Sequence, residues 1–202
     1  MEVFTIGHST LDLSEFIRAL ESQSIDAVAD VRSSPYSRNF PQFNREPLKD
    51  ALSSAKISYV FLGKELGGRP KDDALYTSGV ADYQKMARTN LFKSGMERVE
   101  EGAKKYRIAL MCSERNPLDC HRCLLVGREL SKRGYVIKHI MPGFQNSTQT
   151  DIERDLLKFI NKAEDDMFIS NEERLDEAYK HRARRVAYTE LTDAQSKSAA
   201  AE

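Results

Sequence analysis

Short apolar segments alternate with amphipathic segments over the first 140 residues of the chain. The amphipathic segments repeat apolar residues at helical spacing, as Leu13, Phe16 and Leu20 do. The apolar segments are short and rich in β-branched residues, so we expect strands at 3–6, 25–31, 57–62, 107–112 and 135–140. This alternation predicts an α/β fold with a mainly parallel, roughly five-stranded sheet and helices on both faces.

Four helices are expected beside these strands. They cover 11–23, 46–55, 80–105 and 120–134. The third helix should break near Thr89 and Asn90, and Gly134 should end the fourth.

The pattern changes after residue 145. Two amphipathic helices are expected at 150–166 and 171–188, followed by a polar stretch with little apolar surface to bury. We therefore predict an α/β core domain at 1–145, a helical C-terminal extension at 146–190 and a disordered tail at 191–202.

Composition excludes several classes of protein. Lys and Arg together number 31, as do Asp and Glu, so no overall charge attracts nucleic acid or a membrane surface. No basic segment leads into an apolar stretch at the N-terminus, and no apolar run is long enough to cross a membrane. The three cysteines are too few and too close together for a secreted disulfide framework. We expect a cytoplasmic protein without a membrane partner.

Three polar clusters each follow a predicted strand directly: GHST, DVRSSPYSR and MCSERNPLDCHR. Ligands of open α/β sheets bind beyond the carboxyl ends of the strands, so neighbouring strands would bring these clusters to one edge. The predicted site residues are His8, Ser9, Asp30, Arg32, Ser34, Ser37, Arg38, Cys112, Glu114, Cys120, His121 and Arg122.

The segment 111–122 carries the most reactive side chains. Cys120 precedes a predicted helix, whose unpaired N–H groups stabilise a thiolate, and Arg122 adds positive charge. A thiolate here would be a nucleophile or a redox centre. The alternative is that the cysteines only fill space between helix and sheet, because free cysteine is commonly buried. The candidates for nucleophilic or proton-transfer roles are Cys120, Cys112, His8, Glu114 and His121.

A metal site is a further alternative for this segment. Cys120 and Cys123 form a C-x-x-C pair with His121 between them, and Cys112 lies eight residues upstream of Cys120. A structural zinc site normally has four ligands, and Cys123 and His121 would point to different sides of the same helix. We therefore predict no cofactor, with zinc or another transition metal as the alternative.

Anion binding is indicated by the loop after the second strand. Arginines supply planar donors for phosphate, serines add hydroxyl donors, and helix N-termini add N–H groups. We assign substrate binding to Ser9, Asp30, Arg32, Ser34, Ser37, Arg38 and Arg122. The expected partner is a phosphorylated small molecule or a nucleic acid. The GKELGG segment lacks the spacing of a P-loop and is interpreted as a flexible rim.

Four motifs in order, TIGHST, DVRSSPYSR with PQFN, YVFLGKELGG and LMCSERNPLDCHR, resemble the family called domain of unknown function 488. The resemblance runs from about residue 3 to about residue 140. It implies an α/β fold and a clustered polar site of enzymatic character. By motif, the site carries over to His8, Ser9, Asp30, Arg32, Pro35, Ser37, Cys112, Glu114, Cys120, His121 and Arg122.

The leading hypothesis is an enzyme with an anion pocket and a Cys/His/Glu/Arg cluster at the strand ends. A thiol-dependent or metal-assisted transferase or hydrolase would fit these residues. Two alternatives remain: a non-catalytic module that binds a nucleotide or nucleic acid, and a redox sensor that forms a Cys112–Cys120 disulfide.

Overall fold

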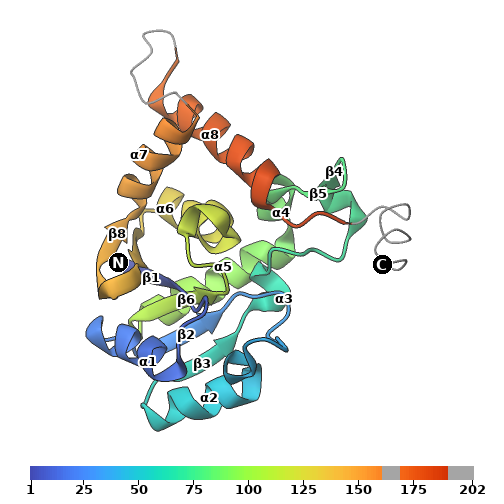
Figure 1. Ribbon diagram of the computed structural model, residues 1–202. Coiled ribbons are helices and arrows are strands. Elements are labelled where there is room, and N and C mark those ends of the chain that lie inside the picture. Colours follow the sequence, from blue (N-terminus) through green and yellow to red (C-terminus); the bar gives the residue numbers. More distant parts are fainter. Residues whose placement is uncertain (161–168, 191–202) are drawn as a thin grey trace.

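The computed structural model describes residues 1–160 and 169–190 (Figure 1). The predicted disordered tail, 191–202, and the end of the first predicted C-terminal helix lie outside the described residues. Within the described ranges, no helix is both long enough and apolar enough to cross a membrane.

Among the described residues, six strands form the main sheet in the order β3-β2-β6-β1-β7-β8. All five predicted strands are present and parallel: β1 (Glu2–Gly7), β2 (Ala27–Asp30), β3 (Ser58–Phe61), β6 (Ile108–Cys112) and β7 (Val136–Ile140). Every residue of β2 and β6 is buried, as expected for central strands covered on both faces. The predicted α/β fold is confirmed.

The sixth strand, β8 (Asn146–Thr148), pairs antiparallel with β7 at the edge of the sheet. Its sequence, Asn-Ser-Thr, lacks the apolar alternation by which a strand is recognised, and the hydrophobic pattern therefore did not predict it. The C-terminal part of the chain thus begins with a strand rather than directly with a helix.

Helices cover both faces of the sheet (Figure 1). On one face, α1 (Leu13–Ser22) and α2 (Arg45–Ser54) bury Phe16, Leu20 and Leu48. The elements on the other side of the sheet are α3 (Gly63–Leu66), α4 (Tyr83–Arg88), α5 (Asn90–Ala103), η4 (Arg122–Gly127), α6 (Arg128–Lys132) and α7 (Gln149–Phe159). The last helix, α8 (Asn171–Val186), packs on α7, η3 and η4 rather than on the sheet (Figure 1). Short 3₁₀ turns are η1 (Pro41–Phe43), η2 (Asp73–Leu75), η3 (Pro117–Asp119) and η5 (Pro142–Phe144).

The long helix predicted at 80–105 is two helices. Thr89 separates α4 from α5, and its hydroxyl accepts a 3.1 Å hydrogen bond from the Phe92 N–H, so the predicted break is confirmed. The predicted start is wrong, because Val80 and Ala81 form β5 (Val80–Ala81) and pair with β4 (Tyr76–Thr77). Asp82 then caps α4.

The helix predicted at 120–134 begins with a π-helical segment, η4, and continues as α6. Gly134 follows at a φ of 86° and closes it as predicted. π-helical turns are rare and often lie at functional sites, and this one starts directly after Cys120 and His121.

A chain of buried hydrogen bonds joins the C-terminal helices to the sheet. His139 Nδ1 lies 2.8 Å from Thr5 Oγ1, and His139 Nε2 lies 2.9 Å from Gln149 Oε1. The Gln149 amide donates to the Tyr179 hydroxyl, which donates to the Glu153 carboxylate at 2.9 Å. Because an amide oxygen only accepts, Nε2 carries a proton. Burial lowers the pKa of His139 to about 4, so near neutral pH Nδ1 is unprotonated and accepts from the Thr5 hydroxyl. The imidazole is therefore neutral and both of its nitrogens are paired.

We expect His139 to reduce the stability of the protein below about pH 6.5. Burial lowers the pKa of His139 to about 4, whereas histidine in an unfolded chain titrates near 6.5. Between these values the unfolded chain binds a proton that the folded protein does not. The free energy of unfolding should therefore fall by up to about 1.4 kcal/mol per pH unit from this residue alone. Urea unfolding between pH 7 and pH 4 measures the slope.

Carboxylates also titrate in this range, so the contribution of His139 is the difference in slope between the wild type and His139→Gln. Equal slopes for the wild type and H139Q would contradict the prediction.

Candidate functional site

The carboxyl ends of β2, β6 and β1 lie side by side at one edge of the sheet. The strand register pairs Asp30 with Met111 and Gly7 with Cys112. The polar segments that follow these three strands therefore meet at this edge, which is where open α/β sheets bind ligands.

Gly7 allows the chain after β1 to run against the loop after β6. A Cβ atom at position 7 would overlap the carbonyl group of Glu114. The main-chain N–H of His8 donates to the Cys112 carbonyl at 2.9 Å, which continues the pairing of the two strands. Only glycine permits this approach, and it places His8 beside the cysteine segment.

An open cleft of about 530 Å³ lies over these strand ends. The predicted site residues that line the cleft are His8, Ser9, Arg32, Ser34, Ser37, Cys112, Glu114, Cys120 and His121. Three others lie elsewhere: Asp30 and Arg122 are buried behind the lining, and Arg38 is exposed and is not a lining residue.

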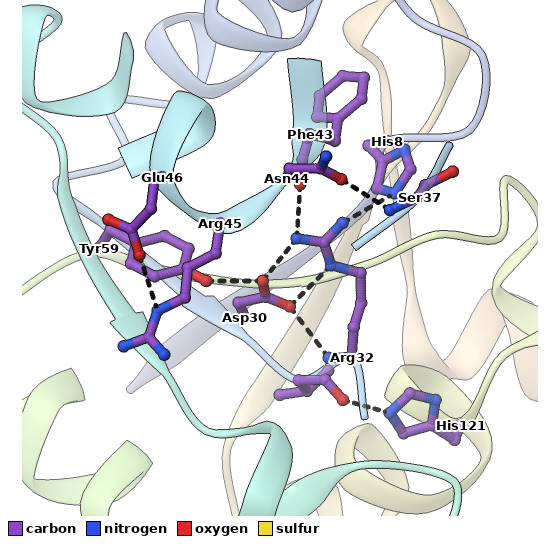
Figure 2. Close-up of polar contacts among 11 residues, drawn as sticks. His8, Asp30, Arg32, Ser37, Phe43, Asn44, Arg45, Glu46, Tyr59 and His121 are labelled. Atoms are coloured by element: carbon purple, nitrogen blue, oxygen red, sulfur yellow. Dashed lines mark hydrogen bonds and ion pairs between the residues drawn. The ribbon is translucent and has the colours of Figure 1, made fainter. Parts of the chain in front are cut away.

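Asp30 and Arg32 form a buried ion pair in one wall of the cleft (Figure 2). Arg32 Nε donates to Asp30 Oδ1 at 3.0 Å and Nη2 donates to Oδ2 at 2.7 Å. Nη2 also donates to the Phe43 carbonyl at 2.9 Å, and the Tyr59 hydroxyl donates to Asp30 at 2.8 Å. Arg32 therefore uses most of its donors to hold the wall together.

His8 is neutral and fully engaged. Arg32 Nη1 lies 3.3 Å from His8 Nε2, and a guanidinium can only donate, so Nε2 accepts and Nδ1 carries the proton. Nδ1 donates to the Ser9 carbonyl at 3.0 Å, and the ring stacks on Phe43 with centroids 4.3 Å apart. Burial and the Arg32 charge lower the pKa of His8 to about 4. A role in proton transfer would require His8 to break its hydrogen bond with Arg32 or with the Ser9 carbonyl.

Cys112, Cys120 and His121 form a compact group on the floor of the cleft. The Cys112 and Cys120 sulfurs lie 3.7 and 3.9 Å from His121 Nδ1. His121 Nε2 donates to the Val31 carbonyl at 2.9 Å (Figure 2), which turns Nδ1 toward the sulfurs. Glu114 lies beside the group, with Oε2 at 3.1 Å from Cys112 Sγ. The three donor atoms lie within 4.8 Å of one another and could hold a metal ion.

The two thiols differ in acidity because of their surroundings. Burial alone would raise the pKa of Cys120, but the Cys112 thiol, the Arg122 guanidinium and His121 hold it well below the usual value. The pKa of Cys112 is raised well above its usual value, because its thiol hydrogen-bonds to Cys120 and is buried. Burial also raises the pKa of Glu114, and the nearby Cys120 charge adds to this effect. The surroundings thus favour a Cys120 thiolate beside a Cys112 thiol.

Arg122 supports the loop between the two cysteines from behind. Its side chain is 1% exposed, and Nη1 and Nη2 donate to the carbonyls of Glu114 and Arg115 at 2.6 and 3.1 Å. The main-chain N–H of Arg122 also points at Cys120 Sγ, 3.5 Å away. In this position Arg122 supports the loop and places a positive charge near Cys120.

Cys123 does not join the group formed by the other two cysteines. It is completely buried on the far side of η4, with Sγ at 3.9 Å from Gln149 Oε1. Within the described part of the chain, the metal-capable group consists of Cys112, Cys120 and His121. The expectation that Cys123 and His121 point to different sides is confirmed.

Several lining residues were not singled out from the sequence. They are Thr10, Ser33, Tyr36, Phe40, Gly68, Arg69, Tyr83, Ser113, Asp119, Val186 and Tyr188.

The interpretation of GKELGG as a flexible rim is wrong, because Gly67 and Gly68 are buried. A Cβ atom on Gly68 would lie 2.9 Å from His121 Cγ, so the glycine pair packs against the site. In the sequence, the Gly67-Gly68 pair before Arg69 is the feature that could have indicated this close packing.

The C-terminal part of the chain closes the outer wall of the cleft. Ala81 donates to the Tyr188 carbonyl at 2.9 Å, and the Arg69 guanidinium lies 4.8 Å from the centroid of the Tyr188 ring. Arg182 of α8 donates to the Leu118 carbonyl at 3.0 Å and pairs with Asp119, just before Cys120. No local pattern in the sequence connects α8 with this loop.

A model of the family described as domain of unknown function DUF488 matches residues 12–128, more than half of the chain. The chain therefore belongs to this family, and the resemblance noted in its motifs is confirmed. Comparisons with curated proteins and with solved structures gave no significant match. The matched range includes Cys112, Cys120 and His121 and ends before α7 and α8.

Gly7→Ala should destabilise the protein strongly, because the new methyl group meets the main chain of Glu114 rather than a flexible side chain. We expect a loss of about 3 kcal/mol or more, in the range of severe core strain. Urea unfolding or thermal melting measures it.

Gly134→Ala is the matched control, because a methyl group there would have no heavy atom of another segment within 4 Å and only the φ of 86° opposes the change. It should cost about 1 kcal/mol. A G7A protein as stable as G134A would refute the close approach of the two loops.

Proposed function

We propose that this member of the DUF488 family is an enzyme that binds a phosphate-bearing substrate in the cleft and acts on it with the cysteine cluster. The proposal depends on one observation: a group of reactive side chains, Cys112, Cys120, His121 and Glu114, lies on the floor of an open cleft. Its walls supply cationic and hydroxyl groups suited to an anion.

Arg69 is the cation best placed to meet a ligand. It is exposed, it lines the cleft, and its guanidinium is held over the Tyr188 ring. Arg32, in contrast, already uses several donors within the protein. Hydroxyl groups surround the same space and can donate to phosphate oxygens: Ser9, Thr10, Ser33, Ser34, Ser37 and Ser113.

Aromatic side chains at the cleft favour a nucleotide or a nucleic-acid strand among phosphate-bearing substrates. Tyr36 is 62% exposed and Tyr188 is 40% exposed, and both line the cleft. Exposed aromatic rings beside a basic group provide stacking surfaces for bases and a contact for the phosphate.

The contrast with Cys123 supports chemistry at the other two cysteines. Cys123 is a packing residue, buried against Gln149 and away from the cleft. Cys112 and Cys120 instead lie together with His121, and all three line the cleft. Thiol groups positioned beside a histidine and a carboxylate are typical of nucleophilic or metal-assisted catalysis.

Arg69→Ala should weaken binding of a phosphate-bearing probe by about 10-fold to 100-fold, the range for losing a hydrogen bond to a charged group. Calorimetric titration with ADP at low salt measures it, and inorganic phosphate shows whether the base contributes. Arg18→Ala removes an exposed arginine of α1 and should leave the affinity unchanged. Equal affinities for the wild type and R69A would contradict an anion site at Arg69.

Catalysis is tested with a panel of nucleotides, oligonucleotides and nitrophenyl phosphate esters. Turnover of a member of this panel should fall at least 100-fold in Cys120→Ser, because the replaced group belongs to the reacting cluster. Cys123→Ser should retain turnover. Tight binding that depends on Arg69, with no turnover and no effect of C120S, would instead identify a non-catalytic binding module.

A further inference from the structure

We propose that Cys112, Cys120 and His121 bind a divalent transition-metal ion of the zinc type, with a fourth coordination position open to the cleft. The inference rests on the proposed function, because it specifies what the cluster contributes to catalysis. Its test measures metal binding directly and does not require a substrate.

The three donors have the chemistry and the spacing of such a site. Thiolate and imidazole are the ligands preferred by zinc, with bonds of about 2.3 Å to sulfur and about 2.0 Å to nitrogen. Tetrahedral geometry with these bonds separates sulfur from nitrogen by about 3.6 Å. The observed separations from His121 Nδ1 are 3.7 Å for Cys112 Sγ and 3.9 Å for Cys120 Sγ. Both sulfur–nitrogen separations are therefore within a few tenths of an ångström of the tetrahedral value.

His121 is already oriented as a ligand. Its Nε2–H donates to the Val31 carbonyl at 2.9 Å, which leaves the Nδ1 lone pair facing both sulfurs. Histidine ligands commonly donate their other ring N–H to a carbonyl or carboxylate in this way. Gly68 packs so closely on the ring that a methyl group there would lie 2.9 Å from Cγ. The ring is therefore confined in a metal-binding orientation.

The two cysteines are held by separate parts of the fold. Cys112 is the last residue of the buried strand β6, so the sheet sets its position. Cys120 follows η3, which Asn116 caps through a 3.0 Å bond to the Leu118 N–H. Arg182 holds the same turn from α8. The donors thus converge because of tertiary packing and do not require a metal to fold the loop.

The number of ligands indicates a site open to the cleft. Closed structural zinc sites have four protein ligands, whereas catalytic sites have three and leave the fourth position to water or substrate. In the described residues, the group within 4.8 Å contains three ligands, and all three line the cleft. Glu114 lies beside Cys112, with its carboxylate oxygen 3.1 Å from Sγ. With a metal bound, this carboxylate would be the nearby base for a water at the fourth position.

Titration of metal-free, reduced protein with Co²⁺ under nitrogen tests the site. Cobalt coordinated by two thiolates gives a charge-transfer band in the near ultraviolet, and a tetrahedral site gives strong visible bands. We expect saturation at one Co²⁺ per chain and displacement by Zn²⁺. Cys112→Ser, Cys120→Ser and His121→Asn should each weaken Co²⁺ binding by about 100-fold or more, since even outer-shell changes cost 10-fold to 100-fold.

Cys123→Ser is the matched control, because it removes a buried thiol three residues from Cys120 that lies outside the group. It should bind Co²⁺ as the wild type does, and Glu114→Gln should also retain the metal. Circular dichroism establishes that each variant is folded. The proposal is overturned if folded wild-type protein shows no thiolate charge-transfer band, or if C123S lowers the affinity as much as C120S.

The two proposals can fail separately. ADP binding that depends on Arg69, in protein that takes up no Co²⁺, would overturn the metal site and leave the proposed anion cleft standing. Stoichiometric Co²⁺ binding without affinity for any phosphate-bearing probe would establish the metal site and overturn the proposed substrate class.

Discussion

The buried ion pair between Asp30 and Arg32 organises the edge of the sheet on which the site is built. Asp30 ends β2 and also accepts from Tyr59 of β3, while Arg32 reaches the Phe43 carbonyl and His8. Breaking a buried pair leaves an uncompensated charge, which costs about 3–5 kcal/mol. One guanidinium therefore connects the loops after β1 and β2 and fixes the spacing between them.

A second buried guanidinium holds the loop after β6 in place. Arg122 donates to two successive carbonyls, those of Glu114 and Arg115, and its charge lies near Cys120. Two arginines beside the cleft thus use their side-chain donors for hydrogen bonds within the protein. This arrangement leaves Arg69, which is exposed and rests on Tyr188, as the cation with the greatest freedom to meet an anion.

The C-terminal part of the chain belongs to the architecture of the site, although the family match ends at residue 128. It is fastened to the sheet by the buried chain from Thr5 through His139 to Gln149 and Tyr179. It then supplies Val186 and Tyr188 to the cleft and secures the turn before Cys120 through Arg182. Helices outside the matched range can therefore shape which ligand enters a cleft whose floor lies within that range.

The sequence by itself determined the α/β class, the five parallel strands and the three polar segments at their ends. Hydrophobic periodicity is a local property, and strands buried on both faces are recognisable as short apolar runs. It also separated Cys123 from His121, because residues two apart on a helix face different directions. It missed β8, whose three polar residues form a strand only because the edge of β7 is available to pair with them.

Only the tertiary structure decided what the predicted site residues do. Cys112 faces the cleft because of the register of β6 against β1, and a shift of one residue would have turned it away. Arg32 and Arg122 became supports because the folding of the loops brings the Asp30 carboxylate and main-chain carbonyls to their donors. Arg69 and Tyr188 joined the cleft through contacts between segments more than 100 residues apart. Such contacts depend on how the elements pack together, and no local pattern of residues encodes them.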